Sequence, residues 1–368
     1  MKRRYKVLGA VSMLVVVALS SLALVLSHNS PCAVAQAQPA GVQSMKAVVH
    51  RCYGPPEVLR LEDIARPTLA DDRVLIKVHA ASVNPLDWHL MRGEPYLIRG
   101  MAGLGAPDDI RLGVDFAGTV ETVGKNVKRF KPGDEVFGGA DGAFGEYVSL
   151  AENGALALKP SNLTFEQAAA VPIAAITALQ ALRDAGKIQR GQKVLINGAS
   201  GGVGTFAVQI AKVFGAEVSG VCSTRNLAMV RSIGADHVID YTRGDFTRGS
   251  QRYDLILDNV GTHSLSEYRR VLNPRGALII VGTQDKGRWL GVLSALIKAK
   301  LVAPFVRQKL VFILAELKAD DLGTLRDLMQ AGKVTPIIDR RYRLSEVPEA
   351  IRYLEAGHAQ GKVVISLD

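Results

Sequence analysis

Cysteine is scarce in this sequence: its 368 residues include only three, Cys32, Cys52 and Cys222. No two of them have the Cys-x-x-Cys spacing, and the sequence contains no His-Glu-x-x-His motif. The count is too low for a disulfide framework or for a structural zinc site built from four cysteines, which excludes both as the basis of the fold. Cys222 lies in an apolar run and is expected in the core rather than as a nucleophile.

Aromatic residues are also few, at 6% of the sequence, and the net charge of +10 comes from basic residues scattered among acids. A nucleic-acid-binding surface requires clustered basic residues interleaved with aromatics, so no nucleic-acid partner is expected. A mild positive balance suits an anionic cofactor equally well. The length predicts about two domains.

The amino terminus differs in composition from the rest of the chain. Four basic residues lie within positions 2–6 and precede an uncharged apolar run over residues 7–26. This order predicts a signal peptide or a membrane anchor, with a linker, over residues 1–44. Ala33-Val34-Ala35 offers a cleavage pattern. If the leader is translated, the protein is expected to be exported or membrane-anchored, with the folded part outside the cytoplasm. If Met45 is the true start, the product is cytoplasmic.

The chain between residues 46 and 150 is predicted to be rich in β-structure. Short apolar segments alternate with Gly and Pro, and one helix is expected at residues 85–92. From residue 164 onward, near-continuous apolar strands alternate with amphipathic helices, which indicates a doubly wound parallel sheet and an α/β fold. After residue 301 the chain is expected to return to the first domain.

The glycine-rich segment at residues 197–204 carries the strongest functional signal. It follows a predicted strand at residues 193–197 and leads into a predicted helix at residues 202–214. Such a turn lets the backbone approach an anion, and the helix N-terminus presents free N–H groups to a pyrophosphate. The sequence therefore predicts dinucleotide binding by Ser200, Gly201, Gly202, Val203 and Gly204.

The same segment also fits the Gly-x-Ser-x-Gly turn of α/β-hydrolases, with Ser200 as the nucleophile. A hydrolase would not explain Gly204, and the sequence has no oxyanion-hole glycine cluster upstream. Ser200 is therefore interpreted as a hydroxyl donor to phosphate.

The end of the next strand bears on the choice of cofactor. A site for NAD usually has an Asp or Glu there, which binds the ribose 2′-hydroxyl. This sequence has Ser223, Thr224 and Arg225 instead. Because hydroxyl and guanidinium groups bind a 2′-phosphate, the sequence favours NADPH over NADH.

With these residues in view, the sequence resembles the zinc-free quinone oxidoreductase (zeta-crystallin-like) branch of the medium-chain dehydrogenase/reductase superfamily. The resemblance extends from Met45 to Asp368 and is carried by the glycine-rich segment and four further stretches, at residues 191–212, 53–59, 82–87, 113–118 and 131–136. It implies a GroES-like β-rich catalytic domain at residues 45–165 and 306–368. It also implies a Rossmann NAD(P)-binding domain at residues 166–305 and a homodimer.

The sequence departs from the zinc-dependent branch of that superfamily. That branch has a cysteine at the position of Asn84 and a His-Glu pair at the positions of Val114 and Asp115. Asp115 alone cannot hold zinc, so the resemblance implies no metal site. Without a Lewis acid, reduction of an electrophilic quinone or C=C bond is easier than oxidation of an alcohol.

The resemblance also implies roles for residues outside the glycine-rich segment. Asn84 is expected beside the nicotinamide and the substrate, and Tyr53 is expected to form a wall of the substrate pocket; these two are the catalytic candidates. Further cofactor-binding residues are expected at Thr177, Tyr241, Asn259, Val260, Gly282, Thr283 and Lys362.

The sequence therefore predicts an NAD(P)H-dependent, zinc-independent oxidoreductase that transfers hydride to a quinone or an α,β-unsaturated carbonyl. Among enzymes, the alternative is a zinc-free alcohol dehydrogenase-like protein or an enoyl reductase. Outside enzymes, the alternative is a membrane-associated protein that binds a nucleotide without turnover, with residues 7–26 as the membrane contact.

Overall fold

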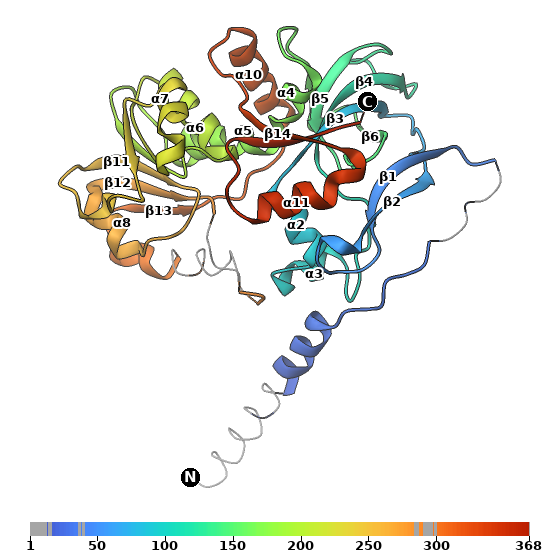
Figure 1. Cartoon of the computed structure of the whole chain (residues 1–368), viewed down its shortest axis with the longest axis horizontal. Helices are drawn as coiled ribbons and strands as arrows, with labels where there is room; N and C mark the ends of the chain where they lie inside the picture. Colours follow the sequence, from blue (N-terminus) through green and yellow to red (C-terminus); the bar gives the residue numbers. More distant parts are fainter. Residues whose placement is uncertain are drawn as a thin grey trace.

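The structure is a computed structural model that describes residues 13, 17–35, 38, 41–282, 287–289, 297 and 300–367. Its described strands form a two-stranded, a seven-stranded and a six-stranded sheet. Figure 1 shows the two large sheets side by side, with the N-terminal helix leaving the molecule below them. The two-stranded sheet pairs β1 (Ser44–His50) with β2 (Leu59–Ala65) in antiparallel register.

The seven-stranded sheet combines strands from both ends of the folded part. It is antiparallel except for the parallel pair β14–β15, and its order is β14-β15-β3-β4-β5-β7, with β6 paired to β3. The C-terminal residues therefore complete a sheet that the first half of the chain begins. The strands are β3 (Arg73–Val83), β4 (Asp115–Val123), β5 (Glu135–Gly139), β6 (Tyr147–Ala151), β7 (Leu156–Leu158), β14 (Ile338–Arg343) and β15 (Lys362–Ser366).

The six-stranded sheet is parallel throughout, in the order β10-β9-β8-β11-β12-β13. This is the 3-2-1-4-5-6 order of a dinucleotide-binding doubly wound sheet, which confirms the α/β fold class. The strands are β8 (Lys193–Asn197), β9 (Glu217–Cys222), β10 (His237–Asp240), β11 (Tyr253–Asp258), β12 (Leu272–Ile280) and β13 (Lys309–Phe312).

Strand β13 differs from expectation, because it extends the parallel sheet beyond residue 305, where the first domain was expected to resume. The segment is short, and its pairing with β12 is a long-range contact that local sequence does not signal.

Helices cover both faces of the parallel sheet, because alternate residues of its strands point in opposite directions. Val194 and Ile196 of β8 join one core together with α6, whereas Leu195 joins a second core together with α8. The α-helices between residues 85 and 355 include α2 (Pro85–Arg92), α3 (Arg99–Ala102), α4 (Phe165–Ala169), α5 (Pro172–Gln180), α6 (Gly202–Val213), α7 (Leu227–Ser232), α8 (Leu265–Val271), α10 (Ala319–Gln330) and α11 (Val347–Glu355). A π-helical turn, Ala181–Ala185, continues α5.

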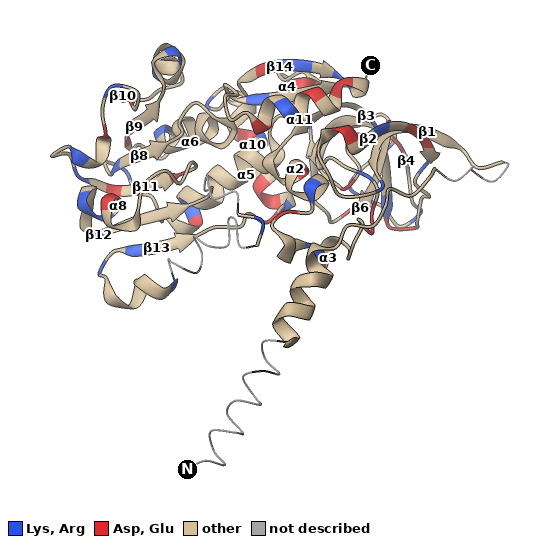
Figure 2. Ribbon diagram, turned by 60° about the horizontal axis from the view of Figure 1, so that its bottom comes forward, with Lys and Arg blue, Asp and Glu red and all other residues tan. Residues whose placement is uncertain are grey.

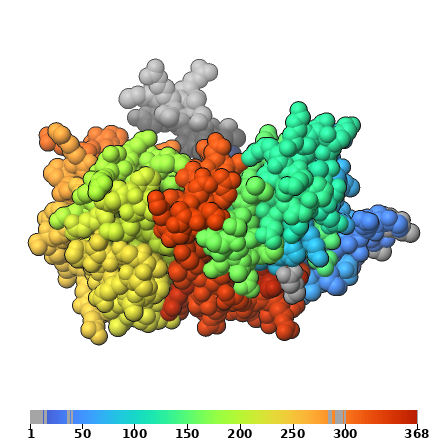
Figure 3. All heavy atoms as spheres, turned by 90° about the horizontal axis from the view of Figure 1, so that it is seen from above, coloured from blue at the N-terminus to red at the C-terminus, as the bar shows by residue number. Residues whose placement is uncertain are grey.

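The C-terminal segment joins the two large sheets. The N–H of Gly361 donates to the carbonyl of Ser200 (2.8 Å), which places the start of β15 against the glycine-rich segment. Gly361 has φ +87°, and a Cβ there would approach the carbonyl oxygen of Ile337 to 2.2 Å, so the crossing requires glycine. Figure 3 shows the C-terminal residues between the two halves of the molecule.

The N-terminal segment is attached to the folded part. Residues 17–27 are helical, and a disulfide joins Cys32 to Cys52, whose Cα atoms lie 4.6 Å apart. We did not expect this pair, because the sequence assigns Cys32 to a separate leader. Within the part of the chain that the structure describes, no helix has the length and apolarity needed to cross a membrane.

Gly204 tests the packing of α6 on the glycine-rich turn. A Cβ at Gly204 would lie 2.0 Å from the carbonyl oxygen of Gly198. Gly204→Ala should therefore destabilise the fold by roughly 1–3 kcal/mol. A Cβ at Gly323, in α10, would have no neighbouring atom within 4 Å, so Gly323→Ala should stabilise the fold by about 0.5–1 kcal/mol. Thermal unfolding measures both shifts, and a shift of the same sign in the two variants would contradict the packing described here.

Candidate active site

Asn84 stands where strand β3 ends and helix α2 begins. Its backbone is extended (φ −129°, ψ 159°), Pro85 occupies the first helical position, and its N–H donates to Oδ2 of Asp87 (2.7 Å). Proline favours this position because its fixed φ suits the helix and its missing N–H is not needed there. The side chain of Asn84 is only 2% exposed, so it is held inside the molecule at the helix N-terminus.

Four buried side chains meet at this point: Ser82, Asn84, Asp115 and Lys362, which we call the Asn84 cluster. Nζ of Lys362 donates to Oδ1 of Asn84 (2.5 Å) and to the carbonyl of Val83 (3.2 Å), and it lies 3.5 Å from Oδ2 of Asp115. The same Asp115 oxygen accepts from Nδ2 of Asn84 (2.9 Å) and Oγ of Ser82 (3.0 Å). The amide of Asn84 is therefore fixed at both of its polar atoms.

Strand register brings the Asn84 cluster together. Strand β4 pairs with β3 so that Asp115 lies opposite Ser82, and β15 pairs with β3 so that Val363 lies opposite Val83. The cluster therefore depends on three neighbouring strands whose residues are far apart in the sequence.

Asp115 and Lys362 form a fully buried ion pair. Burial raises the pKa of the Asp115 carboxyl and lowers the pKa of the Lys362 ammonium, and the opposite charge of each partner offsets part of this effect. Asp115 also accepts hydrogen bonds from Ser82, Asn84 and the backbone N–H of Ile173 (2.9 Å). Donors of this kind stabilise the ionised carboxylate.

The glycine-rich turn lies directly beside the Asn84 cluster. Gly198 has φ +75°, which allows the chain to turn after β8, and no side chain caps the N-terminus of α6. A Cβ at Gly202 would lie 3.2 Å from the side chain of Lys362, so the turn and the cluster are adjacent. A helix N-terminus of this kind offers N–H groups and a favourable dipole to an anion.

Two asparagines near the turn have a buried oxygen without a partner, Oδ1 of Asn226 and Oδ1 of Asn259. Nδ2 of Asn226 donates to Oγ of Ser200 (2.9 Å), and Nδ2 of Asn259 donates to the carbonyl of Asn197 (2.9 Å). Buried polar atoms are normally satisfied, so these two oxygens suit a ligand that donates hydrogen bonds. Together with the uncapped helix, they fit the ribose hydroxyls and phosphates of a dinucleotide.

The residues expected around a 2′-phosphate lie at the edge of this region. Thr224 and Arg225 are exposed, Ser223 is half-buried, and Tyr241 is 58% exposed. Nη2 of Arg225 donates to the carbonyl of His358 (2.5 Å).

Sequence reasoning missed an acidic residue near the expected 2′-phosphate position. Asp240 ends the neighbouring strand β10 opposite Cys222, and its Oδ2 accepts from Oγ1 of Thr224 (2.5 Å). The parallel register of β9 and β10 is the signal that would have found it.

The remaining cofactor candidates line the carboxyl ends of the parallel strands or α5. The backbone N–H of Val260 donates to Oδ1 of Asp258 (3.1 Å), and the N–H of Gly282 donates to the carbonyl of Asp258 (3.3 Å). Thr177 is buried in α5, and its hydroxyl donates to the carbonyl of Ile173 (2.7 Å). Thr283 lies outside the described residues.

Tyr53 lies at the opposite end of α2 from Asn84. Its hydroxyl donates to the carbonyl of Gly103 (2.8 Å), and its ring packs against Gly93, which ends α2. The eight residues of α2 span about 12 Å. The structure thus places Tyr53 apart from the Asn84 cluster, and its role as a wall of the substrate pocket stays a prediction.

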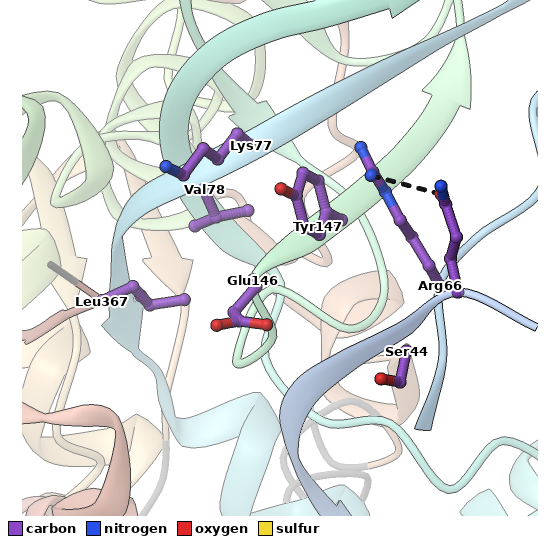
Figure 4. Close-up of a pocket in the computed structure, with 8 residues that line it drawn as sticks. Ser44, Arg66, Lys77, Val78, Glu146, Tyr147 and Leu367 are labelled. Carbon is purple, nitrogen blue, oxygen red and sulfur yellow. Dashed lines mark hydrogen bonds between the residues drawn. The ribbon is translucent and has the colours of Figure 1, made fainter. Parts of the chain in front are cut away.

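A cavity of about 510 Å³ lies elsewhere, between β3, β6 and the segment before β1. Its lining includes Arg66, which stacks on Tyr147 with 3.6 Å between the guanidinium carbon and the ring centre (Figure 4). None of the candidate site residues lines this cavity, so it is separate from the Asn84 cluster.

Sequence reasoning missed Ser82 and Asp87 and considered Asp115 only as a zinc ligand. All three are polar residues within buried segments of strand or helix, and this is the signal that marks them. Among the residues that the structure describes, no group of three or more His, Cys, Asp or Glu side chains could hold a metal ion.

A Rossmann sheet joined through a buried polar cluster to a β-rich domain defines a dinucleotide-binding protein of the dehydrogenase type. Two family models match the chain: a zinc-binding dehydrogenase model over residues 233–365 and an alcohol dehydrogenase GroES-like domain model over residues 70–160.

Relatives cover nearly the whole folded part. The mitochondrial NAD(P)H oxidoreductase RTN4IP1 of Mus musculus is 35% identical over 356 residues, covering 88% of this chain and 89% of the mouse protein. The chloroplastic NADPH-dependent alkenal/one oxidoreductase of Arabidopsis thaliana is 34% identical over 338 residues, covering 88% of this chain and 80% of that protein. The structure of the quinone oxidoreductase from Coxiella burnetii matches with a TM-score of 0.75 and 32% identity, covering 89% of this chain and 100% of that one.

The chain belongs to the medium-chain dehydrogenase/reductase superfamily, in its quinone oxidoreductase branch. This confirms the resemblance found in the sequence, together with the GroES-like domain and the Rossmann sheet.

Asp87 provides a test of the buried charge at the Asn84 cluster. Burial raises its pKa from 3.8 to about 7, and its Oδ1 has no hydrogen-bond partner. Between about pH 4 and pH 7 the folded chain therefore holds a proton that the unfolded chain has lost, and this group makes the free energy of unfolding fall as the pH rises. Asp87→Asn removes that dependence, so the variant should gain stability relative to the wild type from pH 5 to pH 8.

The matched control is Asp327→Asn, which changes a carboxylate that is 69% exposed. Denaturant unfolding at pH 5 and pH 8 measures both variants against the wild type. If the difference in unfolding free energy between Asp87→Asn and the wild type is the same at pH 5 and pH 8, the assignment of a raised pKa to Asp87 is wrong.

Proposed function

We propose that this protein is a zinc-independent oxidoreductase that transfers hydride from NADPH to a quinone or an α,β-unsaturated carbonyl. The observation that carries the proposal is the contact between the glycine-rich turn and the Asn84 cluster, made by Gly361 and Lys362. This contact sets a buried, oriented amide and a positive charge beside the predicted cofactor site. The names of the relatives RTN4IP1 and alkenal/one oxidoreductase support the same chemistry.

The residues of the turn are proposed to hold the cofactor. The N-terminus of α6 binds the pyrophosphate, and the free oxygens of Asn226 and Asn259 accept hydrogen bonds from the nucleotide. The bound nicotinamide supplies the hydride, and water or a side chain supplies the proton that completes reduction. Thr177, Val260 and Gly282 border the nicotinamide half in this proposal.

Asn84 is proposed to orient the substrate carbonyl. Lys362 fixes its Oδ1, and Asp115 fixes one hydrogen of its Nδ2. The second hydrogen has only a long contact of 3.4 Å to the carbonyl of Ser82, so it can donate to an oxygen that gains negative charge during reduction. The nearby ammonium of Lys362 stabilises the same charge, which supports a reaction without zinc.

We also propose NADPH as the preferred cofactor and a boundary between the domains that follows β13. The preference rests on Ser223, Thr224 and Arg225, and the boundary rests on the pairing of β13 with β12.

The homodimer expected from the resemblance is part of the proposal, and light scattering tests it.

The direct test is an assay of NADPH oxidation with quinones and enones. The purified chain should consume NADPH only when such an acceptor is present. NADPH binding without consumption across a panel of quinones and enones would favour a nucleotide-binding protein without turnover and overturn the proposal.

Variants of the ion pair separate catalysis from folding. Lys362→Met leaves the Asp115 carboxylate buried without a counter-charge and should destabilise the fold by roughly 3–5 kcal/mol. The double variant Asp115→Asn/Lys362→Met should recover most of that stability, because no unpaired charge remains. Its turnover should stay about 100-fold below the wild type, since the charge beside Asn84 is gone. Recovery of both melting temperature and turnover would limit Lys362 to a structural role.

Arg225 tests the choice of cofactor. Arg225→Ala should weaken NADPH binding about tenfold, the loss of one charge-assisted hydrogen bond, and should leave NADH binding unchanged. Arg248→Ala is the control, because Arg248 is 82% exposed and pairs with Asp245 instead. Titration of cofactor fluorescence gives the dissociation constants of NADH and NADPH for the wild type and for both variants. If the wild type binds NADH and NADPH equally tightly, and Arg225→Ala changes neither affinity, Arg225 does not bind the 2′-phosphate.

A further inference from the structure

The N-terminal segment is bound to the first domain by specific contacts. Arg99, in α3, is 1% exposed, and its Nη1 donates to the carbonyls of Leu26 (3.0 Å) and His28 (2.9 Å). The N–H of Ser30 donates to the carbonyl of Gly105 (2.8 Å), and Leu26 is 7% exposed. Removal of the segment would leave Nη1 of this buried guanidinium without its two acceptors, although Nε would keep its bond to the carbonyl of Gly93 (2.8 Å).

The disulfide makes this attachment covalent. After cleavage behind Ala35, Cys32 would be linked to the domain only through this disulfide, and a product that began at Met45 would leave Cys52 without a partner. Cys52 is 3% exposed, so the bond lies within the folded domain. Disulfides form and persist in oxidising compartments.

The attached segment carries an exposed apolar helix. In residues 17–27, Val17, Leu19, Leu22 and Leu24 are exposed by 55%, 60%, 52% and 72%. The helix has no charged residue and is uniformly tan in Figure 2. A helix that is apolar around its exposed surface is not a stable surface element in water.

A second apolar surface lies next to the first. Leu97, Met101 and Leu104, around α3, are exposed by 42%, 91% and 59%. Arg99 joins this loop to the N-terminal segment, and the helix leaves the molecule on the side of α3 in Figures 1 and 2. We call residues 17–27 with Leu97, Met101 and Leu104 the apolar face.

We propose that the apolar face docks on a lipid bilayer with anionic headgroups, and that the Cys32–Cys52 disulfide and Arg99 hold it on the folded domain. Charge complementarity selects this occupant. Four basic residues at positions 2–6 precede the apolar run, and the first forty-four residues contain no acid. Basic residues beside an apolar helix are attracted to anionic lipid surfaces. The inference does not depend on the proposed reaction.

Vesicle flotation tests the docking in the absence of any substrate. The oxidised full chain should float with phosphatidylcholine vesicles that contain phosphatidylglycerol, and less with phosphatidylcholine alone. Met101→Glu should weaken binding about tenfold, because it withdraws one large apolar side chain from the bilayer. Leu158→Glu is the control. Leu158 is 43% exposed on β7, an edge strand of the seven-stranded sheet, and does not belong to the apolar face.

Three results would overturn the docking proposal, two of them from flotation. One is a full chain that does not float with anionic vesicles, and the other is equal weakening by Met101→Glu and Leu158→Glu. If Met101→Glu instead changes the oligomeric state in light scattering and leaves vesicle binding intact, the face is a contact between copies of this chain and the proposal is wrong.

Mass spectrometry of the protein from its native source tests the attachment. We expect one linked pair of peptides that contain Cys32 and Cys52, and an amino terminus that precedes residue 17. A mature chain that starts after Ala35, with an alkylatable thiol at Cys52, would overturn it.

Discussion

The buried ion pair between Asp115 and Lys362 links the three parts of the molecule on which the candidate site depends. Lys362 begins the C-terminal strand, Asp115 begins β4, and the neighbouring Gly361 contacts the glycine-rich turn. Transfer of two charges into the interior is costly, and removal of one partner leaves the other uncompensated. The hydrogen bonds from Ser82, Asn84 and the backbone N–H of Ile173 in α5 to Asp115 offset that cost only when β3, β4 and α5 are assembled. The cluster therefore requires the correct assembly of both ends of the chain.

The position of Lys362 gives a physical reason for the difference from zinc-dependent relatives. Its ammonium contacts Asn84 and approaches Asp115, the positions at which the zinc-dependent branch has the cysteine and the Glu of the His-Glu pair. A fixed positive charge at this place can polarise an oxygen without a metal, but it offers less charge than a divalent ion. Such a site suits substrates that are already electrophilic, which is consistent with the proposed quinone or enone.

Local features were predictable from the sequence, and long-range pairings were not. The bounds of α2 and β8 match their predictions, because Asn84-Pro85 and the glycine-rich turn after Asn197 are local signals. The polar strand β14 (Ile338–Arg343) lies at a sheet edge and has no apolar alternation, so nothing in its sequence marked it. Asn84 was identified by resemblance, whereas its bonds to Asp115 and Lys362 depend on the pairing of three strands and could not be derived from spacing.

The contacts of the N-terminal segment were likewise not predictable from the sequence, and they constrain where this segment can lie. Composition alone separates residues 1–44 from the folded part, because apolar runs and linkers of this kind are typical of leaders. In the structure, however, Nη1 of buried Arg99 has its two acceptors on this segment, the carbonyls of Leu26 and His28, and buried Cys52 is joined to Cys32. A buried guanidinium and a buried disulfide are features of a folded domain rather than of a transient leader. The apolar helix that precedes them is therefore carried by the domain, and its exposed side chains need a nonaqueous partner.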